Sequence, residues 1–179
     1  MIIAELEQKT PILYVDMDGV LADFYTPFNK MAGVDSWKDA DKTTISQALK
    51  KITQMNNFWS NLEVLSDVPA LMDAIKEVTG GPYKVLSKAI ASDPNAVSQK
   101  KQWVSILSPK PDETIIMPAT GNKGKYATQS NGTQNILIDD FGYNITQWQQ
   151  AGGIGIQHKN GEVNTTIQNL KKAFKKYEI

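Results

Sequence analysis

Five short apolar segments constrain the fold of this 179-residue chain more than any other feature. Each segment is rich in Ile, Val, Leu or Tyr, and each is continuously apolar, which is typical of strands buried on both faces of a parallel sheet. We expect strands at Ile12–Val15, Tyr83–Leu86, Thr114–Met117, Ile136–Ile138 and Ile154–Gln157.

Segments with helical spacing separate these strands. They are Val68–Val78, Pro94–Leu107, Ile145–Ala151 and Thr165–Tyr177. Asp93 is a candidate N-cap for the second of them, and Pro109 follows its end. Alternating strands and helices predict a doubly wound α/β parallel sheet of the Rossmann-like type with right-handed crossovers.

One interval departs from this alternation, because more than sixty residues separate the first two strands. It holds expected helices at Phe24–Met31 and Thr44–Met55 and the aromatic segment NNFWSNLE. We expect residues 25–65 to form a small helical cap inserted after the first strand, with residues 1–24 and 66–179 forming the α/β core. The alternative is that these helices simply extend the main core.

Composition excludes several chemistries. The chain has no cysteine, so zinc ribbons, disulfide scaffolds and thiol nucleophiles are excluded. A single histidine, His158, excludes a multi-histidine metal site, and we expect it to be structural or exposed. Lys and Arg together number 19, as do Asp and Glu, so the chain lacks the basic excess that is typical of proteins that bind long nucleic acids. Carboxylate, lysine and hydroxyl chemistry remains.

The N-terminus, MIIAELEQKTPILYVD, lacks the basic region and long apolar core of a signal peptide. No segment approaches the roughly 20 apolar residues that span a bilayer. We therefore expect a cytoplasmic protein without a membrane partner, acting in the host cell cytoplasm if a phage encodes it. The oligomeric state is left open.

Paired carboxylates follow two of the expected strands. Asp16 and Asp18 end the first strand, where Gly19 allows a turn, and Asp139 and Asp140 end the fourth. Ligands of open α/β sheets bind beyond the carboxyl ends of the strands, and clustered anions are costly unless a cation joins them. Oxygen ligands suit Mg²⁺. Each Asp could instead cap the next helix, but two pairs at two strand ends favour a metal site.

The segment YVDMDGVLADF resembles motif I, DxDG[TV], of the haloacid dehalogenase-like (HAD) phosphohydrolase superfamily. With LADF included, it is similar to the 5′(3′)-deoxyribonucleotidase family. Ser87 in YKVLSK, a lysine in GNKGKYA, and LIDD followed by NITQW and GGIGIQH resemble the remaining motifs in order. The resemblance extends from Tyr14 to His158.

This resemblance implies specific roles for the acidic residues. Asp16 would be the nucleophile that forms an aspartyl-phosphate, and Asp18 would be the general acid and base. Asp16, the Asp18 backbone carbonyl and one of Asp139 and Asp140 would hold Mg²⁺. The Ser87 hydroxyl and a lysine would bind the phosphoryl oxygens.

The identity of that lysine stays open between Lys123 and Lys125, because the segment before the fourth strand contains extra polar residues. Gly19 of motif I is a further phosphate-site candidate. Lys88 either contacts phosphate or faces solvent. Lys100 matches a family feature, but its place on a helix favours a surface or bracing lysine.

Aromatic residues are the implied base and sugar pocket. Phe24, Phe58 and Trp59 match the positions after motif I and in the insertion, and their flat faces could stack on a base. Phe24 could equally be a core residue. We expect Trp103 and Trp148, both on helices, to pack in the core.

The resemblance implies a Mg²⁺-dependent phosphatase acting on nucleoside monophosphates, deoxyribonucleotides in particular. The alternatives are a polynucleotide 3′-phosphatase, a small-metabolite phosphatase, or a binding protein that holds a nucleotide without turnover. The preferred base, and the choice between 3′ and 5′ phosphates, are not determined by the sequence.

Overall fold

A computed structural model describes residues 9–177 of the chain. The first eight residues, where we expect no signal peptide, lie outside the described part, as do the last two. Within residues 9–177, no helix has the length and apolar character needed to cross a membrane.

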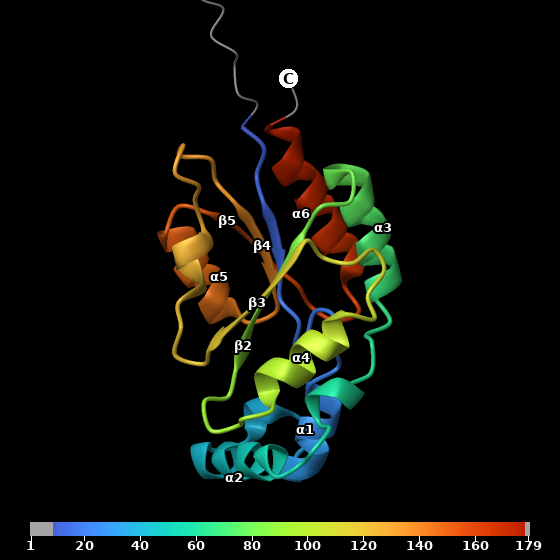
Figure 1. The fold of residues 1–179 in the computed structure, drawn as a ribbon, viewed down its shortest axis with the longest axis vertical. Coiled ribbons are helices and arrows are strands. Elements are labelled where there is room, and N and C mark those ends of the chain that lie inside the picture. The colour runs from blue at the N-terminus through green and yellow to red at the C-terminus, as the bar shows by residue number, and fades with distance from the viewer. Residues whose placement is uncertain (1–8, 178–179) are drawn as a thin grey trace, which may run out of the picture.

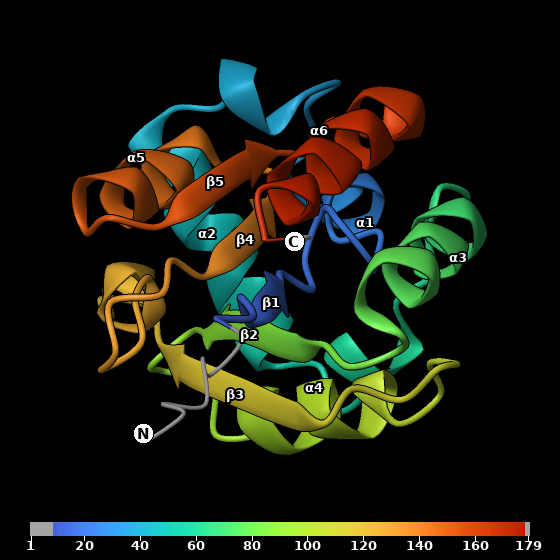
Figure 2. The same cartoon turned by 90° about the horizontal axis from the view of Figure 1, so that it is seen from above.

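The described residues form a five-stranded parallel sheet, with strands in the order β3-β2-β1-β4-β5 (Figure 2). All five expected strands are confirmed within a few residues: β1 (Leu13–Val15), β2 (Lys84–Ala89), β3 (Glu113–Pro118), β4 (Ile136–Asp139) and β5 (Ile154–Gln157). The order runs outward from β1 in both directions, so β1 and β4 flank the point where it reverses. This doubly wound topology places a ligand crevice at their carboxyl ends.

Helices cover both faces of the sheet, which explains why every residue of β1 and β4 is buried. Alternate residues of a strand point to opposite faces. Val15 therefore joins the core under α3 (Val68–Thr79), α4 (Ala96–Val104) and α6 (Val163–Lys175), whereas Tyr14 packs with Trp148 of α5 (Gly142–Gln150). Trp103 and Trp148 are buried as expected, on opposite faces.

Two helices begin at other residues than the sequence predicts, and in both cases an aspartate just before the helix accepts a hydrogen bond. The helix expected from Ile145 begins at Gly142. Its preceding residue, Phe141, donates its backbone N–H to Asp139 Oδ1 (2.9 Å). The helix expected from Pro94 begins at Ala96, so Asp93 is not its N-cap. Asp93 instead accepts from the Trp59 indole, a contact described below.

The long interval after β1 holds α1 (Tyr25–Ala32), η1 (Trp37–Asp39), α2 (Lys42–Thr53) and η2 (Trp59–Asn61). In Figure 1, α1 and α2 lie at the bottom, beyond the carboxyl ends of the strands. Buried side chains of this segment, Phe28 and Ile52 among them, belong to the same apolar core as Val15. The division into a core and a cap at residues 25–65 stays a prediction.

Candidate active site

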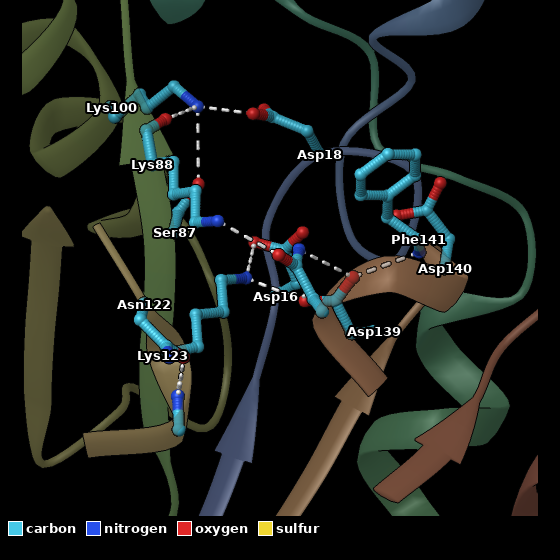
Figure 3. A network of polar contacts seen from close by, with 12 residues as sticks. Asp16, Asp18, Ser87, Lys88, Lys100, Asn122, Lys123, Asp139, Asp140 and Phe141 are labelled. Atoms are coloured by element: carbon cyan, nitrogen blue, oxygen red, sulfur yellow. Dashed lines mark hydrogen bonds and ion pairs between the residues drawn. The ribbon is translucent and has the colours of Figure 1, made fainter. Parts of the chain in front are cut away.

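The carboxylates that follow β1 and β4 meet where the strand order reverses. Leu13 pairs with Ile136, so the ends of these neighbouring strands lie side by side. Oxygen atoms of Asp16, Asp139 and Asp140 all lie within 4.8 Å of one another (Figure 3). The structure therefore brings three of the four predicted acidic residues into one group.

A buried lysine bridges two of these carboxylates. Lys123 Nζ lies 2.8 Å from Asp16 Oδ1 and 2.7 Å from Asp139 Oδ2. Burial opposes its positive charge, but the charges of Asp16 and Asp139 prevail and raise the pKa of Lys123 above 10.5. Lys125 is exposed, with its ammonium 4.9 Å from the Tyr126 ring centroid. Of the two candidates, only Lys123 reaches the site.

Lys100 is the second lysine of the site, and of the two expected positions, surface or bracing, the structure excludes the surface one. It is fully buried, and it donates to Asp18, to Ser87 Oγ (3.2 Å) and to the Lys88 carbonyl (2.8 Å). The sequence holds a signal for this position. Lys100 lies four residues after Ala96 and three before Trp103, both buried, so helical spacing places all three on one face.

Ser87 and Lys88, the two candidate residues of β2, have different neighbours. Ser87 is buried beside Lys100 at the carboxyl end of the sheet. Lys88 is half-buried and donates to Asn144 Oδ1 (2.9 Å), and burial lowers its pKa. Asn144 in turn donates to both oxygens of Asp139 (3.2 and 3.0 Å), a supporting role for which the sequence offers no specific signal.

Gly19 shapes the turn, and its amide is not a free phosphate donor. Its N–H donates to the Ala22 carbonyl (2.9 Å), and its φ of +77° lies in the left-handed region that favours glycine. A Cβ at this position would lie 2.5 Å from Asp140 Oδ2. Gly19 therefore allows the β1 loop to pass close to Asp140, and its place as a phosphate-binding residue stays a prediction.

Excess negative charge dominates the metal side of the site. Burial, together with the charge of Asp16, raises the pKa of Asp140 to about 7 and that of Asp139 to about 6. The Tyr25 hydroxyl donates to Asp140 Oδ2 (2.7 Å) and opposes this rise. Tyr25 was not predicted from the sequence, because only the fold brings α1 to the end of β4.

The side chains present fit a divalent cation. Four carboxylates face the two ammonium groups of Lys100 and Lys123. Asp16 Oδ1 is ion-paired without a hydrogen bond, and Asp18 Oδ1 has no hydrogen-bond partner among the described residues. An all-oxygen donor set matches the preference of Mg²⁺. The Asp18 carboxylate pairs with Lys100 and is not part of the three-carboxylate group.

A hollow of about 280 Å³ opens above these carboxylates. Its walls are mostly apolar, and its lining residues are Asp16, Asp18, Phe24, Tyr25, Phe28, Trp37, Ile45, Leu49, Asp140 and Phe141. Tyr25 stacks on Trp37 with ring centroids 5.7 Å apart, and the ring centroids of Phe141 and Trp37 are 6.2 Å apart. The hollow therefore combines an anionic floor with an aromatic wall.

Of the predicted base-pocket residues, only Phe24 lines this hollow. Trp59 is buried, stacked parallel on Phe24 with centroids 5.5 Å apart, and its Nε1 donates to Asp93 (2.7 Å). Phe58 borders a separate hollow of about 590 Å³ that contains none of the clustered aspartates. Neither residue lines the hollow above the aspartates, and core packing between η2 and α4 covers the Trp59 ring.

His158 lies in the core beside α6. Its Nδ1 is 2.9 Å from Thr166 Oγ1, and its Nε2 is 3.7 Å from Asp67 Oδ2. Burial lowers its pKa below 6.5. These contacts make His158 a structural residue, and the sequence analysis expects it to be either structural or exposed.

No protein-family model and no curated protein sequence matches the chain. Solved structures do match it. A haloacid dehalogenase-like family hydrolase from Xanthomonas campestris has a TM-score of 0.56 at 11% identity, over 96% of this chain and 94% of that one. A HAD family hydrolase from Deinococcus radiodurans R1, with bound phosphate and sodium, has a TM-score of 0.56 at 10% identity, over 96% and 97%. The chain thus has a HAD-like fold.

Proposed function

We propose that this protein is a Mg²⁺-dependent phosphomonoesterase that hydrolyses nucleoside monophosphates, deoxyribonucleotides in particular. One observation carries the proposal: Asp16 lies where the strand order reverses, grouped with Asp139 and Asp140 and ion-paired with Lys123. The ordered motifs of the sequence and the HAD-like fold support it.

The side chains of the site account for both halves of such a reaction. An oxygen of Asp16 attacks phosphorus, and the bond from phosphorus to the nucleoside oxygen breaks. Asp18 gives its proton to the departing oxygen, then takes a proton from the water that cleaves the aspartyl-phosphate. Burial raises the pKa of Asp18 despite the opposing charge of Lys100, which suits a group that must carry that proton.

The lysines and the metal site provide positive charge for the phosphoryl group. Lys100 and Ser87 lie together at the end of β2, where they would contact phosphoryl oxygens. Lys123 holds Asp16 and Asp139 in place through its two ion pairs. Mg²⁺ bound by Asp16 with Asp139 or Asp140 would offset the repulsion between the carboxylate and the phosphate.

The aromatic wall supports a nucleoside as the leaving group. Phe24, Tyr25, Trp37 and Phe141 surround the hollow above Asp16, and flat aromatic faces stack favourably on bases. The charge balance of the chain favours a mononucleotide over a long nucleic acid, because a polyanion needs many cationic contacts.

Phosphate release from all ribo- and deoxyribonucleoside monophosphates, with and without Mg²⁺, tests the proposal. We expect Mg²⁺-dependent release that Asp16→Asn abolishes, while Asp73→Asn, at an exposed position of α3, retains it. Absence of release from every mononucleotide would refute the proposal. A preference for 3′-phosphorylated oligonucleotides would indicate a polynucleotide phosphatase, and tight binding without release a non-catalytic protein.

A further inference from the structure

Trp59 contacts Lys100 directly. Lys100 Nζ lies 4.2 Å from the centroid of the Trp59 ring, and Phe24 stacks parallel on the same ring. A cation near an aromatic face is attracted by the ring quadrupole, most strongly for tryptophan and in a desolvated setting. Trp59 is 2% exposed and Lys100 is fully buried, so water does not weaken this contact.

Several hydrogen bonds hold the Trp59 ring in place. Its Nε1 donates to Asp93 Oδ2 (2.7 Å), and its backbone N–H donates to Gln99 Oε1 (3.1 Å). Gln99 also donates to the Asn56 carbonyl, which ties the segment before η2 to α4. Gln99 and Lys100 are neighbours on α4, so the indole and the lysine are held by the same helix.

The proposed reaction makes this contact useful. Lys100 has one carboxylate partner, Asp18, among the described residues. Ser87 Oγ and the Lys88 carbonyl accept hydrogen bonds from the same ammonium, and the indole face adds a further attraction that fixes its position beside them. A phosphoryl group that binds at Ser87 would therefore meet an ammonium that the ring already holds in place.

We propose that Trp59 is a positioning residue, whose indole face holds the Lys100 ammonium where it can contact the phosphoryl group. This proposal rests on the function proposed above for Asp16 and Asp18. It assigns Trp59 to the lysine, and not to stacking on the substrate base. Phe24 lines the hollow and stacks on the indole, so its ring lies between the hollow and Trp59.

Two substrates separate these roles. Deoxynucleoside 5′-monophosphates carry a base, whereas 2-deoxyribose 5-phosphate has the same phosphate without one. We expect Trp59→Leu to lower kcat by about 10- to 100-fold on both substrates by a similar factor, with a smaller change in KM, because a misplaced charged group costs mainly in the transition state. Trp59→Phe, which keeps an aromatic face, should recover most of that loss.

Trp103→Leu is the matched control. Trp103 is also buried, lies one turn after Lys100 on α4 and donates its indole N–H to the Leu62 carbonyl (2.7 Å). We expect this variant to lower the melting temperature as much as Trp59→Leu while retaining kcat. Equal losses of kcat in the two variants would show a packing effect and overturn the proposal. A loss confined to nucleotides and to KM would show base stacking and would also overturn it.

A spectroscopic measurement tests the contact independently of turnover. The ammonium resonance of Lys100, identified by its loss in Lys100→Met, should show a ring-current shift in the wild type. The shift should disappear in Trp59→Leu and persist in Trp103→Leu. If the wild type hydrolyses neither substrate, the proposed function fails, while this shift still reports the lysine contact. An unchanged resonance in Trp59→Leu would overturn the proposed positioning.

Discussion

Lys123→Met removes the only ammonium that contacts both Asp16 and Asp139 within residues 9–177. The ammonium is fully buried, and its two ion pairs measure 2.8 and 2.7 Å. Methionine retains a similar volume without charge. The substitution therefore leaves two neighbouring buried carboxylates that repel each other, with little loss of packing.

The expected loss of stability is large. Removing one partner of a buried ion pair costs about 3–5 kcal/mol, because the remaining charge stays desolvated. In a domain of this size, each 1 kcal/mol changes the melting temperature by about 2–4 °C. Lys123→Met should therefore lower the melting temperature of the metal-free protein by about 6–20 °C.

Thermal unfolding followed by circular dichroism in EDTA, and again in Mg²⁺, measures this effect. Lys171→Met is the control, because its pair with Glu77 (2.8 Å) is exposed and should contribute less than about 1 kcal/mol. Lys123→Met/Asp139→Asn should recover part of the loss, since the second change removes one unpaired carboxylate. Mg²⁺ should also recover part of it by supplying positive charge. Equal melting temperatures for Lys123→Met and Lys171→Met in EDTA would refute the reasoning.

Three further predictions concern the turn, the core histidine and the metal. Gly19→Ala should abolish phosphate release and lower the melting temperature, because φ at Gly19 is +77° and the new Cβ would lie 2.5 Å from Asp140 Oδ2. Gly132→Ala is the control and should retain release, because φ there is +83° but no atom lies near the new Cβ. Below pH 6.5 the unfolded chain protonates His158 while the folded chain, with its lowered pKa, resists protonation, so stability should fall as pH falls. Urea unfolding between pH 5 and about pH 8 should show a shallower fall for His158→Gln, and identical profiles would contradict this assignment. Mg²⁺ should raise the wild-type melting temperature, and Asp139→Asn should reduce that increase; an equal increase in both would exclude Asp139 as a ligand.

Local patterns predicted the strands and the acidic residues that follow them. A strand that is buried on both faces is mostly apolar, so Ile12–Val15 and Ile136–Ile138 are recognisable without any partner. The parallel arrangement then places the residues after these strands at one edge of the sheet. For this reason Asp16 and Asp139 were expected to meet, and they do.

Contacts between distant segments were harder to predict. Lys100 and Lys101 are adjacent on one helix, yet one is fully buried and the other exposed. A charge on a helix normally favours solvent. Lys100 is buried because distant segments surround its ammonium with Asp18, the Trp59 ring and acceptors on β2. The same packing covers the Trp59 ring, so the expectation of a base-stacking role was not supported.

The sequence by itself determined the layered α/β architecture and the two acidic strand ends, because both depend on periodicity and on residues close together in the chain. Only the tertiary structure decided which lysine meets Asp16, which residue supports Asp140 and which aromatic rings line the hollow. Lys123 contacts Asp16 whereas Lys125 lies over the Tyr126 ring, and the Tyr25 hydroxyl donates to Asp140. These choices depend on burial and charge summed over segments far apart in sequence, which no local pattern records.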